Sequence, residues 1–106
     1  MLKINRSPIN RSLSVGFNLK FTNGWIVSVQ FGMLNHCANK NKVVDDLEVK
    51  CINAEVAAWD REERWYDFGD DTVRGYLSAD EVSDFIHMIR NLEEDYNGNT
   101  IPCNRL

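Results

Sequence analysis

The sequence has few of the residues that cross-link or interrupt a polypeptide chain. Only three cysteines and two prolines occur among its 106 residues, and the cysteines, at positions 37, 51 and 103, are odd in number and widely spaced. This usage is not typical of a secreted domain held by disulfides, and it favours free thiols in a reducing cytoplasm. No uncharged stretch is long and apolar enough for a membrane span or a signal peptide, so we expect no membrane association.

The chain also lacks an excess of positive charge. Its formal net charge is −4, which argues against a protein that binds the nucleic-acid backbone directly. Residues 1–50 contain seven Lys/Arg and three Asp/Glu, whereas residues 51–106 contain five Lys/Arg and thirteen Asp/Glu. The stretch 60–84 alone has nine carboxylates. Two interpretations remain open: a solvated acidic face, or a patch that meets a basic partner, such as a protein that normally binds nucleic acid.

Length and composition indicate one folded domain. A chain of 106 residues can bury one core, and its content of 43% apolar and 26% charged residues lies close to the globular average. No internal repeat or linker divides it. We therefore expect a single domain over residues 1–106, with an irregular N-terminal arm at 1–11 and a loose C-terminal tail at 93–106.

The clearest pattern is an alternation of apolar and polar residues on both sides of an Asn-Gly pair at 23–24. Period-two alternation predicts strands, and the Asn-Gly pair predicts a hairpin over about 12–32. A three-residue loop at 22–24 would pair Phe21 with Trp25 and place nearly all the large apolar side chains on one face. A two-residue loop would split them between both faces. We therefore predict the three-residue loop, with its glycine in the left-handed conformation.

A second hairpin is predicted over about 48–68. Its first strand, 48–59, would point Ala54, Val56 and Ala58 at the core, and its second strand, 65–68, would return after a turn at 60–64. Trp59 would then face Trp65 across the turn. The residues that follow, 69–77, contain two glycines and two adjacent aspartates and are predicted to form a loop, with a short extended piece at 74–77 as an alternative.

A helix is predicted near the C-terminus. Ser78 and Glu81 have the spacing of a capping box, and apolar residues then recur at helical spacing. The apolar stripe consists of Val82, Phe85, Ile86, Ile89 and Leu92. The predicted fold is therefore α+β: an antiparallel four-stranded sheet of two hairpins (about 12–32 and 48–68), covered on one face by a C-terminal helix (about 79–92).

No pattern in the sequence points to catalysis. Potential metal ligands are present, but none has the spacing of a metal site, and no glycine-rich phosphate loop occurs. A cysteine nucleophile would need a base beside it, and aspartates next to glycines are more typical of turns than of hydrolytic carboxylate pairs. The potential metal ligands are His36, Cys37, Cys51, His87 and Cys103. We expect a protein that is not an enzyme and uses neither metal nor cofactor.

Two groups of residues are candidates for binding. By the predicted pairing, Trp59 and Trp65 lie together on the face away from the helix. There they form either a small covered cluster or a contact surface for a partner, a second copy of the chain or a stacked base. The candidate partner-binding residues are Trp59, Trp65, Asp67, Asp70 and Asp71.

The second group depends on the loop at 33–46, which is rich in Asn and Lys and long for so small a domain. Long ordered loops often carry function. Its side chains, with two from the segment after residue 73, could supply stacking and phosphate contacts. These alternative ligand-binding residues are Asn35, His36, Lys40, Lys42, Arg74 and Tyr76.

The segments at 17–32, 35–37, 54–60, 65–69 and 75–82 resemble small, mostly uncharacterised proteins of bacteriophages and prophages. In that pattern the turn after residue 60 often contains glycine where this chain has Glu63. The resemblance implies a phage accessory protein that acts in the host cytoplasm, for example as a non-enzymatic inhibitor that binds a host immune protein such as a CRISPR effector. Alternatives are a sponge that sequesters a nucleotide-derived immune signal, and a structural phage accessory protein.

Overall fold

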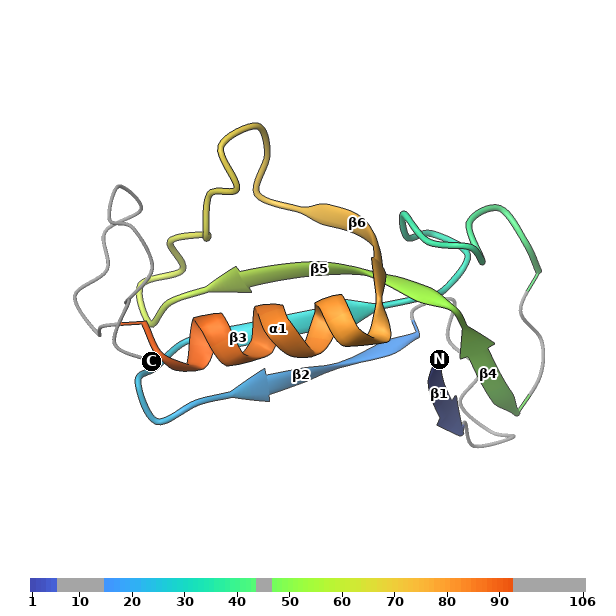
Figure 1. Cartoon of the computed structure of the whole chain (residues 1–106), viewed down its shortest axis with the longest axis horizontal. Coiled ribbons are helices and arrows are strands. Elements are labelled where there is room, and N and C mark those ends of the chain that lie inside the picture. The colour runs from blue at the N-terminus through green and yellow to red at the C-terminus, as the bar shows by residue number, and fades with distance from the viewer. Residues whose placement is uncertain (6–14, 44–46, 93–106) are drawn as a thin grey trace.

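The structure, a computed structural model, describes residues 1–5, 15–43 and 47–92. It contains two antiparallel sheets and one helix (Figure 1). The elements are β1 (Leu2–Asn5), β2 (Gly16–Lys20), β3 (Ile26–Gln30), β4 (Glu48–Cys51), β5 (Asn53–Trp59), β6 (Arg74–Ser78) and α1 (Ala79–Arg90). The main sheet has the strand order β2-β3-β5-β6, and β1 pairs with β4 in a second, two-stranded sheet. The predicted α+β class with a C-terminal helix is confirmed, whereas the strands are divided differently from the prediction.

The first hairpin has the predicted register. The pairs are Phe17 with Val29, Leu19 with Val27 and, across the loop, Phe21 with Trp25, whose backbone groups share a hydrogen bond of 2.8 Å. Gly24 has a φ of 91°, as a three-residue loop requires. The inward-facing residues on the β3 side are fully buried: Trp25, Val27, Val29 and Phe31. The alternation of apolar residues therefore predicted both the loop length and the buried face.

The second hairpin is not the predicted one. Trp65 forms an isolated bridge to Trp59, and the Tyr66 N–H donates to the Ala58 carbonyl at 2.8 Å, but residues 65–68 form no strand. The side chain of Asp67 accepts a hydrogen bond from the Gly69 N–H at 2.7 Å, which turns the chain away from the sheet. The fourth strand is instead β6, which coincides with the short extended piece at 74–77 that the sequence allowed within the predicted loop.

The predicted strand at 48–59 is broken at Ile52, whose side chain is 63% exposed. Its first part, β4, leaves the main sheet and pairs with β1, which lies inside the arm predicted to be irregular. Alternation within β1 explains this pairing, because Leu2 is buried opposite Cys51 and Ile4 lies opposite the buried Val49. The rest of that arm, 6–11, and the predicted tail at 93–106 lie outside the described residues.

The helix begins as predicted and ends two residues earlier. Ser78 accepts a hydrogen bond from the Glu81 N–H at 3.2 Å, and the Glu81 carboxylate accepts one from the Ser78 N–H at 2.9 Å. The hydrogen bond from the Ser78 backbone lowers the pKa of Glu81 below its ordinary value. At the other end, the side-chain amide of Asn23 lies 3.0 Å from the carbonyl oxygen of Ile89 and 3.1 Å from that of Leu92. The turn of the first hairpin thus caps the helix C-terminus.

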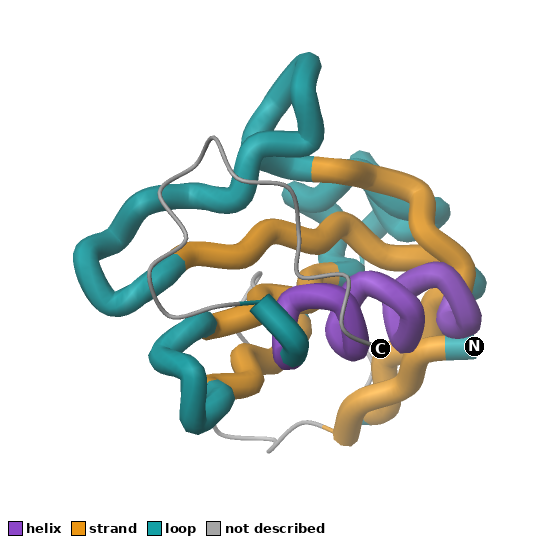
Figure 2. Tube along the Cα trace, turned by 60° about the vertical axis from the view of Figure 1, so that its left-hand side comes forward, coloured by secondary structure: helices purple, strands orange, loops and turns teal. Residues whose placement is uncertain are grey.

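The helix covers one side of the main sheet, where it packs on β3, β5 and β6 (Figures 1 and 2). Its buried residues are Val82, Phe85 and Ile89. On the edge strand β2, Phe17 and Leu19 face the same side but stay 39% and 37% exposed, because the helix lies over the other three strands. The two-stranded sheet and the loop after β3 lie at the end of the molecule where β1 begins (Figure 1). No helix among the described residues is long and apolar enough to cross a membrane.

Candidate functional site

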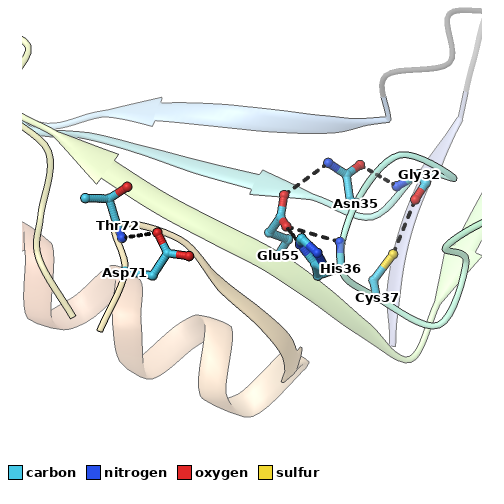
Figure 3. A network of polar contacts seen from close by, with 7 residues as sticks. All are labelled: Gly32, Asn35, His36, Cys37, Glu55, Asp71 and Thr72. Atoms are coloured by element: carbon cyan, nitrogen blue, oxygen red, sulfur yellow. Dashed lines mark hydrogen bonds and ion pairs between the residues drawn. The ribbon is translucent and has the colours of Figure 1, made fainter. Parts of the chain in front are cut away.

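A pocket of about 530 Å³ opens on the side of the sheet opposite the helix. It lies where the loop after β3 meets β5, β6 and the segment before β6 (Figure 3). Its lining residues are Leu34, His36, Glu55, Asp71, Val73, Gly75 and Tyr76. The pocket therefore joins three parts of the chain that are far apart in sequence.

Glu55 organises one wall of this pocket. Its position in β5 alternates with the buried Ala54 and Val56, so its side chain leaves the sheet on the helix-free side. One carboxylate oxygen accepts a hydrogen bond from Asn35 Nδ2 at 3.3 Å, and the other contacts His36 Nδ1 and accepts from the His36 N–H at 3.1 Å (Figure 3). This carboxylate holds the loop against the sheet and orients the imidazole, which leaves His36 Nε2 for a ligand.

The opposite strand is irregular at this point. Ala54 pairs with Leu77 and Val56 with Arg74, so that two residues, Gly75 and Tyr76, oppose the single residue between them on β5. This is a β-bulge, and Tyr76 adopts a φ of 60°. Bulges and positive φ at residues other than glycine concentrate at functional sites, because the surrounding structure must hold them in place. Here the bulge places an aromatic ring that is 56% exposed in the pocket lining.

Gly75 allows the loop to approach β6 closely. The Tyr76 N–H donates to the His36 carbonyl at 2.9 Å, and a Cβ atom on Gly75 would lie 2.5 Å from the Cβ of His36 and 2.9 Å from its carbonyl oxygen. Both distances are shorter than non-bonded contacts allow. Glycine is therefore required at this position for the loop to dock.

We expect Gly75→Ala to lower the free energy of unfolding by about 1–2 kcal/mol, because the added methyl group must push the His36 backbone away from β6. Urea denaturation measures the loss, and amide NMR shifts should place the change at residues 34–38. Gly69→Ala is the matched control, since its φ of 104° strains alanine but its Cβ would meet no atom within 4 Å. A destabilised Gly69→Ala variant with unchanged His36 signals is expected. Unchanged His36 signals in Gly75→Ala would contradict the docking role.

The structure brings together half of the predicted alternative ligand-binding residues. Asn35, His36 and Tyr76 meet at the pocket. The cations do not: Lys40 and Lys42 belong to the same loop without lining the pocket. Arg74 pairs with Asp70 at 3.1 Å and lies 4.9 Å above the centre of the Phe68 ring. The positive side chains that a phosphate would need are therefore not assembled around this pocket.

The tryptophans of the predicted partner-binding group do meet. The ring centres of Trp59 and Trp65 are 5.0 Å apart with 36° between the ring planes, and Trp65 is 46% exposed. Trp59 leaves β5 on the same side as Glu55, about 13 Å further along the strand. The turn that joins the two tryptophans includes Glu63 with a φ of 62°, a conformation that glycine adopts without strain.

The three predicted aspartates take different roles. Asp67 accepts the hydrogen bond from Gly69 described above, and Asp70 is paired with Arg74. Asp71 accepts from the Thr72 N–H at 2.7 Å and belongs to the pocket lining (Figure 3). All three are exposed. Asp71 thus connects the pocket with the acidic loop that follows the tryptophans.

Four pocket residues were in neither predicted group: Leu34, Glu55, Val73 and Gly75. A signal existed for Glu55, because it is the one charged residue in an otherwise largely apolar strand, and a charged side chain in such a strand needs a partner. Cys37, by contrast, does not fit the role of a nucleophile. Burial raises the pKa of its thiol to about 11, so the thiol stays protonated at neutral pH. Among the described residues, no three His, Cys, Asp or Glu side chains lie close enough together to hold a metal ion.

Comparisons with known proteins assign no family to this chain. A scan against protein-family models, a search of curated proteins and a search of solved structures each find no match. The pocket and the tryptophan pair are therefore the features that bear on the function of this chain.

Proposed function

We propose that this chain is a phage-encoded anti-defence protein that inhibits a host immune effector, such as a CRISPR system, by binding it in the host cytoplasm without catalysis. The observation that carries this proposal is the Trp59–Trp65 pair, which stands half exposed beside a strongly acidic segment. The phage setting rests on the sequence resemblance. Small acidic proteins can block a basic surface by occupying it.

The tryptophan pair has the properties of a binding anchor. Its rings contact each other at a tilt of 36°, and the turn between them is held by hydrogen bonds from the backbone to the buried Asp60. A rigid aromatic group loses little conformational entropy when a partner covers it, and tryptophan is the residue most enriched at the energetic centres of interfaces.

The charge around the pair favours a basic partner. Several carboxylates in the segment 62–71 are exposed: Glu62, Glu63, Asp67, Asp70 and Asp71. All three arginines nearby are engaged within the molecule: Arg61 with the Thr22 carbonyl at 3.2 Å, Arg64 with Asp60 at 2.8 Å and Arg74 with Asp70 at 3.1 Å. The surface therefore presents a net negative field that attracts a positively charged protein and repels phosphates. This favours an inhibitor over a nucleotide sponge.

Trp65→Ala is expected to reduce inhibition at least tenfold. An infection assay in host strains that each carry one defined immune system measures it, as the plating efficiency of a targeted phage in cells that express each variant. An anchor of this kind commonly accounts for 2 kcal/mol or more of binding free energy, or about thirtyfold in affinity. Ile52→Ala is the matched control, because this apolar side chain is 63% exposed elsewhere on the molecule and its loss should change nothing.

Two results would contradict the proposal. The first is that Trp65→Ala and the double variant Asp70→Lys, Asp71→Lys both protect the phage from the immune system as well as the wild type does. The second is that the wild-type protein protects the phage from none of the immune systems tested. A thermal-shift panel of cyclic dinucleotides and ADP-ribose derivatives separates the sponge alternative. We expect no shift, whereas a rise of several degrees would establish ligand sequestration instead.

A further inference from the structure

We infer that the pocket between the loop after β3 and the bulge in β6 is a receptor for an arginine side chain of the bound partner. This inference rests on the proposed function and assigns a chemistry to a second contact on the same side of the sheet. It follows from three features of the pocket: its charge, its aromatic wall and the rigidity of its loop.

The charge of the pocket selects a cation. Two of its lining residues are carboxylates, Glu55 and Asp71, and none is Lys or Arg. Asp71 is exposed, and its Oδ1 accepts from the Thr72 N–H. Within the ranges 1–5, 15–43 and 47–92, its Oδ2 has no partner. In Figure 3 Asp71 lies well apart from His36 and Glu55, and all three residues line the pocket. A cation that enters between them meets negative charge from both sides.

The walls of the pocket select arginine over lysine. Tyr76 presents a largely exposed ring, and the apolar side chains of Leu34 and Val73 complete the lining. A guanidinium group is planar, stacks on aromatic rings and binds a carboxylate through two N–H groups, whereas an ammonium group is a compact and strongly hydrated charge. The methylene stem of arginine would pack on the two aliphatic side chains. His36 Nε2 offers a further acceptor for a guanidinium N–H.

Hydrogen bonds within the protein hold the pocket in shape. The loop is held by Glu55 through Asn35 and His36, by the Tyr76 N–H on the His36 carbonyl, and by Asn53 Oδ1, which accepts from the Ala38 N–H at 2.6 Å. A formed pocket saves the entropy that would otherwise be lost when a loop orders around its ligand. A single arginine side chain can therefore bind here measurably, although it is small.

The test is an NMR titration of the full chain with N-acetyl-arginine methylamide. We expect saturable shifts of the amide signals of Asp71, Gly75 and Tyr76, with millimolar affinity. Asp71→Asn should weaken binding about tenfold, because it removes a charge-assisted pair. Tyr76→Gly should weaken it about threefold through loss of the ring. Glycine also suits the positive φ at this position, so this variant keeps the bulge.

The matched control is Asp84→Asn, since Asp84 is exposed on the helix and its change should leave arginine binding intact. The lysine analogue should bind at least fivefold more weakly, and guanosine, which also presents a planar pair of N–H donors, should not compete. The inference is overturned by a lysine analogue that binds as tightly as arginine, by guanosine that binds in preference, by the absence of saturable shifts, or by an unaltered affinity in Asp71→Asn.

The outcome does not depend on knowing the partner. Arginine binding combined with no inhibition in any host would refute the proposed function and leave the receptor pocket in place. Inhibition that depends on Trp65 but is accompanied by no arginine binding would refute the pocket alone. The two proposals therefore fail separately.

Discussion

Replacing Asn23 with aspartate is expected to lower the free energy of unfolding by about 3 kcal/mol, because it removes the donor that caps the helix and adds a negative charge there. The Asn23 side-chain amide lies 3.0 Å from the Ile89 carbonyl oxygen and 3.1 Å from the carbonyl oxygens of Arg90 and Leu92. These carbonyls lie at or just beyond the negative end of the helix dipole, and that of Ile89 also accepts from the Leu92 N–H at 3.1 Å. A carboxylate at this position would have no N–H to donate to these carbonyl oxygens, and their partial negative charge would repel it.

The comparison with alanine separates the two effects. Asn23 also accepts a hydrogen bond from the Trp25 N–H through Oδ1 at 3.0 Å, and aspartate can keep this bond whereas alanine loses it. We expect a loss of about 2 kcal/mol for Asn23→Ala and a larger loss for Asn23→Asp. The Asn23→Asp deficit should shrink at about pH 3, where the new carboxyl is protonated.

Urea denaturation followed by tryptophan fluorescence gives these free energies. Asn18→Asp is the matched control, since Asn18 is exposed on β2 and the same charge change there should cost less than about 0.5 kcal/mol. Equal stability of Asn23→Asp and the wild type at pH 7 would show that the hairpin turn does not cap the helix.

Removing the side chain of Asp60 is expected to cost about 2 kcal/mol and to abolish inhibition. Asp60 is the one charged residue that is buried within the described part of the chain, with 4% exposed. Its Oδ1 accepts from the backbone N–H groups of Glu62 and Arg64, both at 2.9 Å, and its Oδ2 accepts from Arg64 Nε at 2.8 Å. In Asp60→Ala the turn loses all three hydrogen bonds, and Trp65 loses the support that keeps it against Trp59.

The stabilisation from Asp60 depends on pH in a defined direction. Burial by itself would raise its pKa, but the hydrogen bonds from Arg64 and Glu62 and the charge of Arg64 outweigh it, so that the pKa lies below the ordinary value of 3.8. A carboxyl whose pKa is lowered by folding stabilises the protein fully above its unfolded pKa and loses that contribution as the pH falls through its folded pKa. The stability difference between wild type and Asp60→Asn should therefore narrow as the pH falls below about 4.

Measurements of urea midpoints between about pH 3 and pH 7 test this dependence. Asp84→Asn is again the control, because a solvated carboxyl should give a difference close to zero at every pH. If the Asp60→Asn difference stays constant down to about pH 3, the ionised form of Asp60 is not what stabilises the turn. If Asp60→Ala still inhibits the immune effector, the turn that Asp60 holds is not required for the function.

The incorrect strand assignments have a common physical cause. Residues 65–68 and 74–78 both offer apolar and aromatic side chains, and both follow β5, so local sequence does not decide which of them completes the sheet. Two contacts determine that 74–78 is the strand. The Asp67 side chain accepts from the Gly69 N–H and turns the chain away from the sheet, and the loop after β3 docks on β6 through the His36 carbonyl. Strand β1 was missed for a similar reason. Its four residues are too few to predict a strand from their own pattern, and they form one by pairing with β4.

The candidate site was recognised in parts but not as a pocket. The sequence pointed to Asn35, His36 and Tyr76 because a long polar loop and an exposed aromatic residue suggest binding. The sequence did not indicate Glu55, which accepts hydrogen bonds from Asn35 and His36. It also did not indicate that Arg74 would form an ion pair with Asp70 and not face the pocket. The charge of the pocket depends on these two positions, and they change its expected ligand from a phosphate to a cation.

The sequence by itself determined the first hairpin with its register and the helix with its N-cap, because both are encoded by contacts between residues close together in the chain. Alternation around Asn23-Gly24 and the Ser78–Glu81 capping box needed no information from elsewhere. Only the tertiary structure decided the strand partners, the capping of the helix by Asn23 and the assembly of the pocket. Each of these depends on pairs that are 15 to 69 residues apart, for which a local pattern holds no signal.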